Sequence, residues 1–330
     1  MSTRLSPVRK QREISVGGGS WHNPPVRLAA VSVDLDEITN YHQIHGLSEA
    51  QGLSRTLVYD VAVPRLLDFA GRCDLPLTFF AIGRDLERAA ARETLRRARE
   101  AGHEIANHSL DHMYDFTRLT RAGIRTQVEG GVRAIADAVG VAPVGFRAPG
   151  YTVTDEVFAV LSELGVQYDS SVFPCPAYFA AKAAAIGAIA LAGRRSESVV
   201  DTPKVLSAPR RPYRVGRPYW TEGDGVLELP IQVTRGMRLP FIGTSLTLAG
   251  VRGAKLLTKM CVGEPLVNLE LHGIDLLDEG DGLFALSRHQ RDVRVLKETK
   301  LAVFETVVAT LREAGYRFVT LADATRQLSV

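Results

Sequence analysis

Acidic and imidazole side chains follow two short apolar segments of the sequence, and their types suit a metal centre. Asp34 and Asp36 come directly after one apolar run, and His108 and His112 follow another. In an extended segment the two aspartates point to the same side, so they either share a cation or divide metal binding from proton transfer. The two histidines are four residues apart, a spacing that places both imidazoles on one face if the segment is helical.

One carboxylate with two imidazoles gives a three-ligand set that leaves coordination positions open for water and substrate. Zn is the cation most often held in this way, and Fe, Co, Ni and Mn also fit such ligands. The sequence therefore predicts one bound divalent metal ion.

The elements that have to position these residues alternate along the chain. Short apolar runs such as 28–33 (LAAVSV) and 77–82 (LTFFAI) are separated by segments in which apolar residues recur at helical spacing. Strands that are repeatedly followed by helices predict an α/β fold with a parallel sheet and helices outside it. We expect a distorted (β/α) barrel of about seven parallel strands, built as a single domain.

The same patterns give bounds for the expected elements. The expected strands are 28–33, 77–82, 103–106, 144–146, 166–168, 226–233, 266–271 and 317–320. The expected helices are 58–70, 85–101, 120–139, one that starts at 154 and stops at 165, and 288–314.

Other polar residues come at or after the ends of these strands. Arg147 precedes Pro149, and a guanidinium beside a proline-stiffened turn can pin a carboxylate in one orientation. Asp169 ends the strand near 168, and His272 and Asp275 follow the strand 266–271. Because active groups of such folds gather at the carboxyl ends of strands, we expect these side chains to meet at one site.

Composition limits the class of protein. The 330 residues are 45% hydrophobic and 23% charged, with a net charge of +3, which excludes a disordered chain, a coiled coil and a dedicated nucleic-acid binder. Cys73, Cys175 and Cys261 are too widely spaced for a metal pair or a disulfide framework, which indicates a reducing compartment. Residues 1–27 are polar and basic, so we expect a flexible tail and no secretion signal.

The folded domain is expected to span 28–330 and to contain an irregular insertion at about 175–222, which holds five of the sixteen prolines. The apolar patch 177–192 is too short to cross a membrane but suits contact with its surface. We therefore expect a cytoplasmic protein, with peripheral contact at the inner face of the membrane.

From about Leu28 to Leu321, the sequence resembles the polysaccharide deacetylase family, also called the NodB-homology or carbohydrate esterase family four group. The spaced D-x-D form matches the family's base and metal aspartates, and H-S-L-D-H at 108–112 matches its H-S/T-x-x-H motif in full. The family's arginine-proline motif corresponds to Arg147 and Pro149, and its late Leu-x-His motif corresponds to the end of the strand 266–271.

Three departures from the family pattern leave alternatives open. Glu37 follows Asp36, so either carboxylate is a candidate for the acidic ligand, with Asp36 preferred. The arginine motif reads RAPGY in place of RxPYG, which changes the place of Tyr151. The late Asp-Trp motif that tunes the family's catalytic histidine is missing in its common form, and Asp169 or Asp275 would have to replace it.

The resemblance implies metal-assisted hydrolysis of an N-acyl group. Asp34 would be the base, held by Arg147, and His272 would protonate the departing amine. The metal ligands would be Asp36, His108 and His112. The residues expected to bind substrate are Glu37, Tyr41, Pro149, Tyr151, Asp169, Arg211 and Asp275.

The substrate class rests on the insertion. Between Cys175 and Trp220 there are eight basic residues and two acidic ones, and Arg211 lies in the run RRPYR, which suits phosphate or another anion. We expect an amino sugar or glycoconjugate, including one that carries phosphate. An N-deacetylase is the first hypothesis. The alternatives are a deformylase of a lipid-linked or nucleotide-linked amino sugar, an amidase on a non-sugar amide, and a non-catalytic carbohydrate-binding protein.

Overall fold

The computed structural model describes residues 27–48, 50, 52–191, 199–328 and 330. The expected tail 1–27 lies outside these residues, apart from Arg27, and so does the stretch 192–198 of the insertion.

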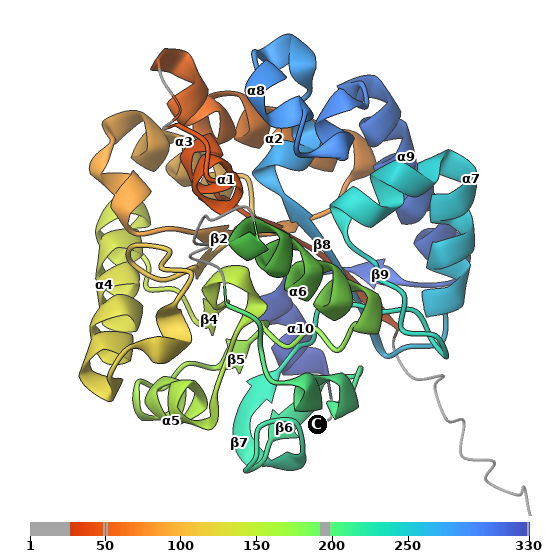
Figure 1. The fold of residues 1–330 in the computed structure, drawn as a ribbon. Helices are drawn as coiled ribbons and strands as arrows, with labels where there is room; N and C mark the ends of the chain where they lie inside the picture. The colour runs from red at the N-terminus through yellow and green to blue at the C-terminus, as the bar shows by residue number, and fades with distance from the viewer. Residues whose placement is uncertain (1–26, 49, 51, 192–198, 329) are drawn as a thin grey trace, which may run out of the picture.

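Within the described residues, nine strands form one curled sheet in the order β6-β7-β5-β4-β3-β2-β1-β8, with β9 paired to β1 (Figure 1). Only β6 and β7 pair antiparallel. The strands are β1 (Leu28–Asp34), β2 (Leu77–Ala81), β3 (Glu104–Asn107), β4 (Gly145–Phe146), β5 (Tyr168–Asp169), β6 (Tyr213–Val215), β7 (Glu222–Glu228), β8 (Leu266–His272) and β9 (Arg317–Phe318). The α/β class is confirmed, with eight strands in parallel pairing where about seven were expected.

Most helices lie around the outside of the sheet (Figure 1). They are α1 (Ile38–His45), α2 (Val63–Cys73), α3 (Ala89–Glu100), α4 (Arg121–Val139), α5 (Asp155–Glu163), α6 (Pro176–Leu191), α7 (Gly243–Cys261), α8 (Phe284–Ser287), α9 (Lys297–Glu313) and α10 (Leu321–Gln327). No helix among the described residues is both long enough and apolar enough to cross a membrane.

The register of the sheet brings the strand ends together. Asp34, the last residue of β1, is paired with His272, the last residue of β8. On the other side of β2, Asn107 of β3 is paired with Phe146 of β4, so His108 and Arg147 follow neighbouring strands. Because all these strands are parallel, their carboxyl ends lie at the same end of the sheet.

The insertion is more regular than expected. Its described part contains α6, a short 3₁₀ helix and β6, which extends the sheet by pairing with β7. The α6 helix is tied to the turn after β4, because Lys182 Nζ donates to the carbonyl oxygen of Gly150 at 2.7 Å. The expected irregularity was therefore wrong for the described part of the insertion.

Two further differences concern helices. The expected helix 288–314 begins only at Lys297, where the Asp278 carboxylate accepts a hydrogen bond from the Lys297 backbone N–H at 2.8 Å and caps the helix. The α7 helix was not expected. It contains Gly250, whose φ of +66° interrupts the helical backbone, so apolar periodicity is a weak signal there.

Close packing of α4 against the end of β3 gives a test of the fold. A Cβ on Gly131 of α4 would lie 2.1 Å from Asn107 Oδ1, next to His108. We therefore expect Gly131→Ala to destabilise the protein by about 1–3 kcal/mol through overpacking, measured by urea unfolding.

Gly71 of α2 is the matched control, because a Cβ there meets nothing within 4 Å. Gly71→Ala should stabilise the protein by about 0.4–1 kcal/mol, the usual effect of this change where space and backbone allow it. Stabilisation by Gly131→Ala as well would show that α4 does not pack this closely.

Candidate active site

Asp36, His108 and His112 form a compact buried group beyond the ends of β1 and β3. Asp36 Oδ1 lies 3.4 Å from His108 Nε2 and 3.2 Å from His112 Nε2, and all three side chains are almost fully buried. Among the described residues, neither Asp36 Oδ1 nor His112 Nε2 has a hydrogen-bond partner. Buried polar atoms without partners are costly, and these two atoms, with His108 Nε2 beside them, form a three-ligand group that fits a divalent cation.

The carboxyl of Asp36 is held ionised in this group. Burial alone would raise its pKa, but the neighbouring imidazoles of His112 and His108 outweigh burial and hold the pKa well below the usual range. An ionised carboxylate is the form that binds a metal.

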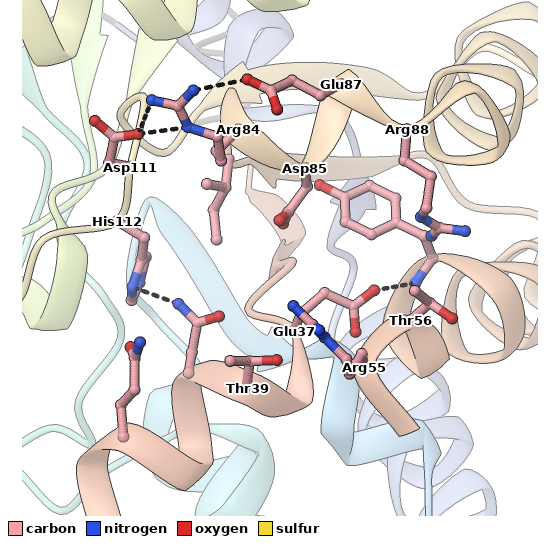
Figure 2. A pocket seen from close by; sticks show the side chains of 14 residues that line it. Glu37, Thr39, Arg55, Thr56, Arg84, Asp85, Glu87, Arg88, Asp111 and His112 are labelled. Atoms are coloured by element: carbon pink, nitrogen blue, oxygen red, sulfur yellow. Dashed lines mark hydrogen bonds and ion pairs between the residues drawn. The ribbon is translucent and has the colours of Figure 1, made fainter. Parts of the chain in front are cut away.

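Hydrogen bonds behind the two histidines orient their Nε2 atoms. His108 Nδ1 donates to the backbone carbonyl of Arg147 at 2.8 Å, so Nε2 carries the lone pair that faces Asp36. Asn40 Nδ2 lies 2.9 Å from His112 Nδ1 (Figure 2). Rotation of the Asn40 amide by 180° would put its oxygen at this contact, so that Nδ1–H donates to the oxygen and Nε2 is free as a ligand. Asn40 was not singled out as a ligand-orienting residue from the sequence.

The histidine motif is not helical, so the helical argument for its geometry was wrong. The segment between the two histidines is a loop in which Ser109 has φ of +68° and His112 has φ of +53°. Left-handed backbone is unfavourable for residues other than glycine, and it is found where the surroundings enforce it. Ser109 Oγ accepts from the His112 N–H at 3.1 Å and closes this turn.

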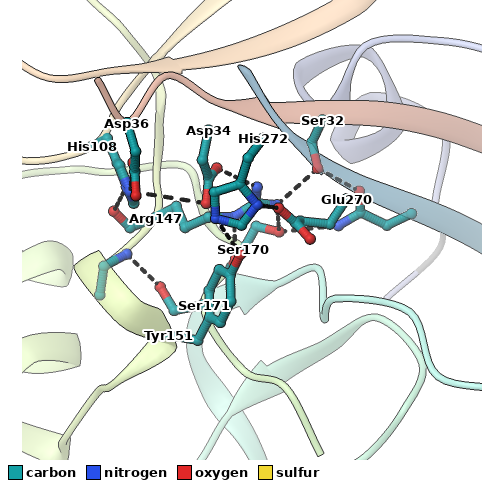
Figure 3. Close-up of polar contacts among 12 residues, drawn as sticks. Ser32, Asp34, Asp36, His108, Arg147, Tyr151, Ser170, Ser171, Glu270 and His272 are labelled. Atoms are coloured by element: carbon teal, nitrogen blue, oxygen red, sulfur yellow. Dashed lines mark hydrogen bonds and ion pairs between the residues drawn. The ribbon is translucent and has the colours of Figure 1, made fainter. Parts of the chain in front are cut away.

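Asp34 is paired with a fully buried guanidinium. Arg147 Nη1 donates to Asp34 Oδ1 at 2.6 Å, Nη2 donates to the hydroxyls of Ser32 and Ser170 at 2.9 Å, and Nε donates to the Ser170 carbonyl at 2.7 Å (Figure 3). The guanidinium also lies over the Phe80 ring, 4.1 Å from its centre. Burial opposes the charge on Arg147, but Asp34, Glu270 and Tyr151 together outweigh burial and raise its pKa.

His272 has a carboxylate partner that the sequence argument missed. Glu270, fully buried in β8, places Oε1 2.9 Å from His272 Nδ1 (Figure 3). Burial would lower the pKa of His272, but Glu270, with smaller contributions from Asp34 and Asp36, outweighs burial and raises that pKa well above the usual value. The signal was available, because residues two apart in a strand share a face and Glu270 is the one acid in LVNLELH.

The two aspartates that were candidates for tuning His272 form hydrogen bonds with other groups. Asp275 Oδ2 accepts from the His272 backbone N–H at 2.8 Å, and no contact joins the two side chains among the described hydrogen bonds. Asp169 accepts from the hydroxyl and the backbone N–H of Ser171, at 2.9 and 3.0 Å. Both carboxylates therefore hold loops beside the site, and neither touches the imidazole.

Two tyrosines lie against the His272 ring. The Tyr151 hydroxyl is 3.1 Å from Nε2, and the Tyr41 ring meets the imidazole edge-on with centres 6.2 Å apart. Pro149 is buried at the start of the turn that carries Tyr151. These residues, expected to bind substrate, thus lie at the same end of the sheet as the metal-binding group.

Glu37 is not part of the ligand group that Asp36 forms with the two imidazoles. Its carboxylate accepts from the backbone N–H groups of Val58 and Tyr59, at 3.1 and 3.3 Å, and faces a pocket of about 340 Å³ that His112 and Asn40 also line (Figure 2). Burial raises the pKa of Glu37 to about 7 and that of Asp85, in the same pocket, to about 8. Of the two acids that the sequence left open, Asp36 is therefore the one placed to bind a metal.

Arg211 is not at the site. Its Nε donates to the buried carboxylate of Glu264 at 2.8 Å, and Arg210 donates to the same carboxylate at 3.1 Å. Glu264 lies before the start of β8, and His272 is the last residue of β8. Because β8 has seven residues, its two ends are about 20 Å apart. The arginines of this run stabilise the opposite end of the sheet, so the expectation that Arg211 binds an anionic substrate is not supported.

This arrangement gives a test of which acid binds the metal. We expect Asp36→Asn to weaken divalent metal affinity about 100-fold or more, measured by isothermal titration calorimetry against Zn²⁺, since a neutral amide replaces the ionised ligand. Glu37→Gln is the matched control and should leave the affinity within about threefold. The reverse pattern would assign the acidic ligand to Glu37.

Comparison with known proteins agrees with this geometry. Residues 57–168 match the family model described as polysaccharide deacetylase, and this range includes both histidines and Arg147. A peptidoglycan deacetylase from Helicobacter pylori is 29% identical over 147 residues, which cover 44% of this chain and 49% of the relative. A chitooligosaccharide deacetylase from Bradyrhizobium is 36% identical over 104 residues, which cover 31% of this chain and 46% of the relative.

The fold is also shared with a solved protein. A crystal structure of a Mycobacterium smegmatis protein assigned as a polysaccharide deacetylase covers 93% of this chain and 92% of its own, with a TM-score of 0.59 and 19% identity. The chain spans about half, or less, of the length of the curated relatives that it matches. The family-model match over residues 57–168 and the curated relatives both support a polysaccharide deacetylase, and the solved structure shares the fold.

Proposed function

We propose that this protein is a metal-dependent hydrolase that removes an N-acetyl group from an amino sugar of a glycan. The observation that carries the proposal is the meeting of three arrangements at one end of the sheet. These are the buried ligand group of Asp36 with two imidazoles, the Asp34–Arg147 pair and the Glu270–His272 pair. Together they supply a cation site, a base and an acid, which hydrolysis of an amide requires.

A divalent ion held by Asp36, His108 and His112 would polarise the acyl carbonyl and lower the pKa of a bound water toward about 7. Zn is the proposed ion, with Co, Ni, Mn and Fe as alternatives that the same ligands suit. Three protein ligands leave the open positions that a catalytic site needs.

Asp34 is the proposed base. Its Oδ1 is occupied by Arg147, whereas Oδ2 lies 3.8 Å from His108 Nε2 and so faces the metal-binding group. A carboxylate fixed in this way has one oxygen held in place and the other directed to a water proton. Arg147 thus orients the base.

His272 is the proposed acid. With its pKa raised by Glu270, the imidazole carries a proton at neutral pH, and it can give that proton to the amine nitrogen as the C–N bond breaks. The electron pair of the broken bond stays on the nitrogen, so the amine leaves neutral. The water proton taken by Asp34 balances the proton given by His272.

The substrate class comes from the family and its curated relatives. Those relatives are named for peptidoglycan, chitin and chitooligosaccharides, all of which contain N-acetylated amino sugars. Acetate and formate release, measured on glycan oligomers, lipid-linked amino sugars and nucleotide-linked amino sugars, tests the proposal and separates it from deformylation. Cytoplasmic location and membrane contact through α6 stay predictions, to be tested by fractionation.

Removal of the base gives one test. Asp34→Asn should keep metal affinity within a few-fold, since Asp34 is not in the group of Asp36, His108 and His112 but in a second one with Glu270 and His272. It should lower kcat about 100-fold or more, because the amide cannot accept the water proton. Acetate release and calorimetry on the same sample measure both. Full turnover in the variant would remove Asp34 from the role of base.

Removal of the carboxylate behind His272 gives a second test, based on pH. The acid must be protonated, so activity is present below the pKa of His272 and falls as pH rises through it. Glu270 raises that pKa, so Glu270→Gln should move the alkaline limb of the kcat profile to lower pH by about one unit or more. An alkaline limb at the same pH in both proteins would contradict this role of Glu270.

A further inference from the structure

The Tyr151 hydroxyl occupies the position from which His272 would deliver its proton. Its oxygen is 3.1 Å from His272 Nε2, while Nδ1 on the other side of the ring is held by Glu270. When the imidazole is charged, both ring nitrogens are donors, so Nδ1–H forms an ion pair with Glu270 Oε1 and Nε2–H donates to the tyrosine oxygen. The hydroxyl therefore stands between the acid and any leaving group that approaches Nε2.

The Tyr151 hydroxyl can still donate one hydrogen bond. Among the described residues, His272 is its one hydrogen-bond partner. A hydroxyl that accepts from Nε2–H still has its own proton to donate. Burial, together with the charges of Glu270 and Asp34, raises the pKa of the phenol well above its usual value, so it is neutral and carries this proton.

The ring itself is fixed in place. It packs against Phe173, Tyr178 and His272, with ring centres 5.8 to 6.1 Å apart. Its backbone has φ of +57°, and the preceding carbonyl, that of Gly150, is bound by Lys182. Left-handed backbone at a tyrosine is unfavourable and points to a functional constraint at this position. A ring held on three sides is poorly suited to swing away for each turnover.

We propose that Tyr151 is a catalytic residue that relays the proton from His272 to the leaving amine. The inference rests on the proposed function and deepens it. In one step, the amine nitrogen takes the proton of the Tyr151 hydroxyl as the C–N bond breaks, and the tyrosine oxygen takes the proton of His272 Nε2. The tyrosine ends as a neutral phenol and the histidine as a neutral imidazole, whose Nε2 lone pair then accepts a hydrogen bond from the re-protonated hydroxyl.

The test is Tyr151→Phe, which removes the hydroxyl and keeps the ring contacts. We expect kcat for acetate release from an N-acetylated glucosamine oligomer to fall about 100-fold, the usual contribution of positioned proton transfer, with KM within about threefold. Tyr178→Phe is the matched control, because Tyr178 packs on Tyr151 without contacting His272, and it should keep kcat within about threefold. Thermal unfolding and Zn²⁺ affinity should match the wild type in both variants.

Three other outcomes would contradict either the proton relay or the proposed function. If Tyr151→Phe keeps the wild-type kcat, or exceeds it, the hydroxyl carries no proton and the relay is wrong, while the proposed function stands. If Tyr178→Phe loses as much activity as Tyr151→Phe, ring packing explains the loss and the relay is also wrong. If the Zn²⁺-loaded wild-type protein releases no acyl group from any of the amino-sugar substrates, the proposed function itself fails and the relay fails with it.

Discussion

The buried pairing of Arg147 with Asp34 is the interaction on which the rest of the site depends. A guanidinium that is fully removed from water is tolerated only when its donors are satisfied, and loss of a buried partner costs about 3–5 kcal/mol. Here the partners come from β1 and from the turn after β5, while Phe80 of β2 covers one face of the group. One side chain therefore fixes the position of the proposed base relative to several strands.

Charge balance explains why a cation belongs beside this pair. Three carboxylates, those of Asp34, Asp36 and Glu270, lie at one end of the sheet with almost no exposure to water. Arg147 compensates the first, and a protonated His272 compensates the last. Asp36 lies beside the imidazoles of His108 and His112, and its Oδ1 makes no hydrogen bond with the described residues. A divalent ion would compensate this charge and use the ligand atoms that are otherwise unpaired.

Much of this site could be predicted from sequence because parallel strands impose it. Apolar runs locate the strands, and the chemistry lies where each run ends, as the pairing of Asp34 with His272 shows. Glu270 was missed because it lies inside an apolar strand, where a charged residue is easily taken for part of the sheet. Its role depends on the alternation of faces, which puts it beside the imidazole two residues later.

Other features depend on contacts that no local pattern contains. The left-handed turn at Ser109 and His112 is set by the surrounding strands, so the spacing of the histidines suggested a helix that does not form. The charge of Arg211 suggested a substrate anion, but the fold places it against Glu264, a residue 53 positions away in the chain. In both cases the residue type indicated a polar contact, but the tertiary fold decided which residue makes that contact.

The central claim is that side chains distant in sequence surround one divalent ion. Anomalous X-ray scattering from crystals grown with Zn²⁺ tests it most directly. The account expects one strong peak within about 2.0–2.2 Å of a carboxylate oxygen of Asp36 and of Nε2 of both His108 and His112. A peak at another place, with none between these three residues, would contradict it.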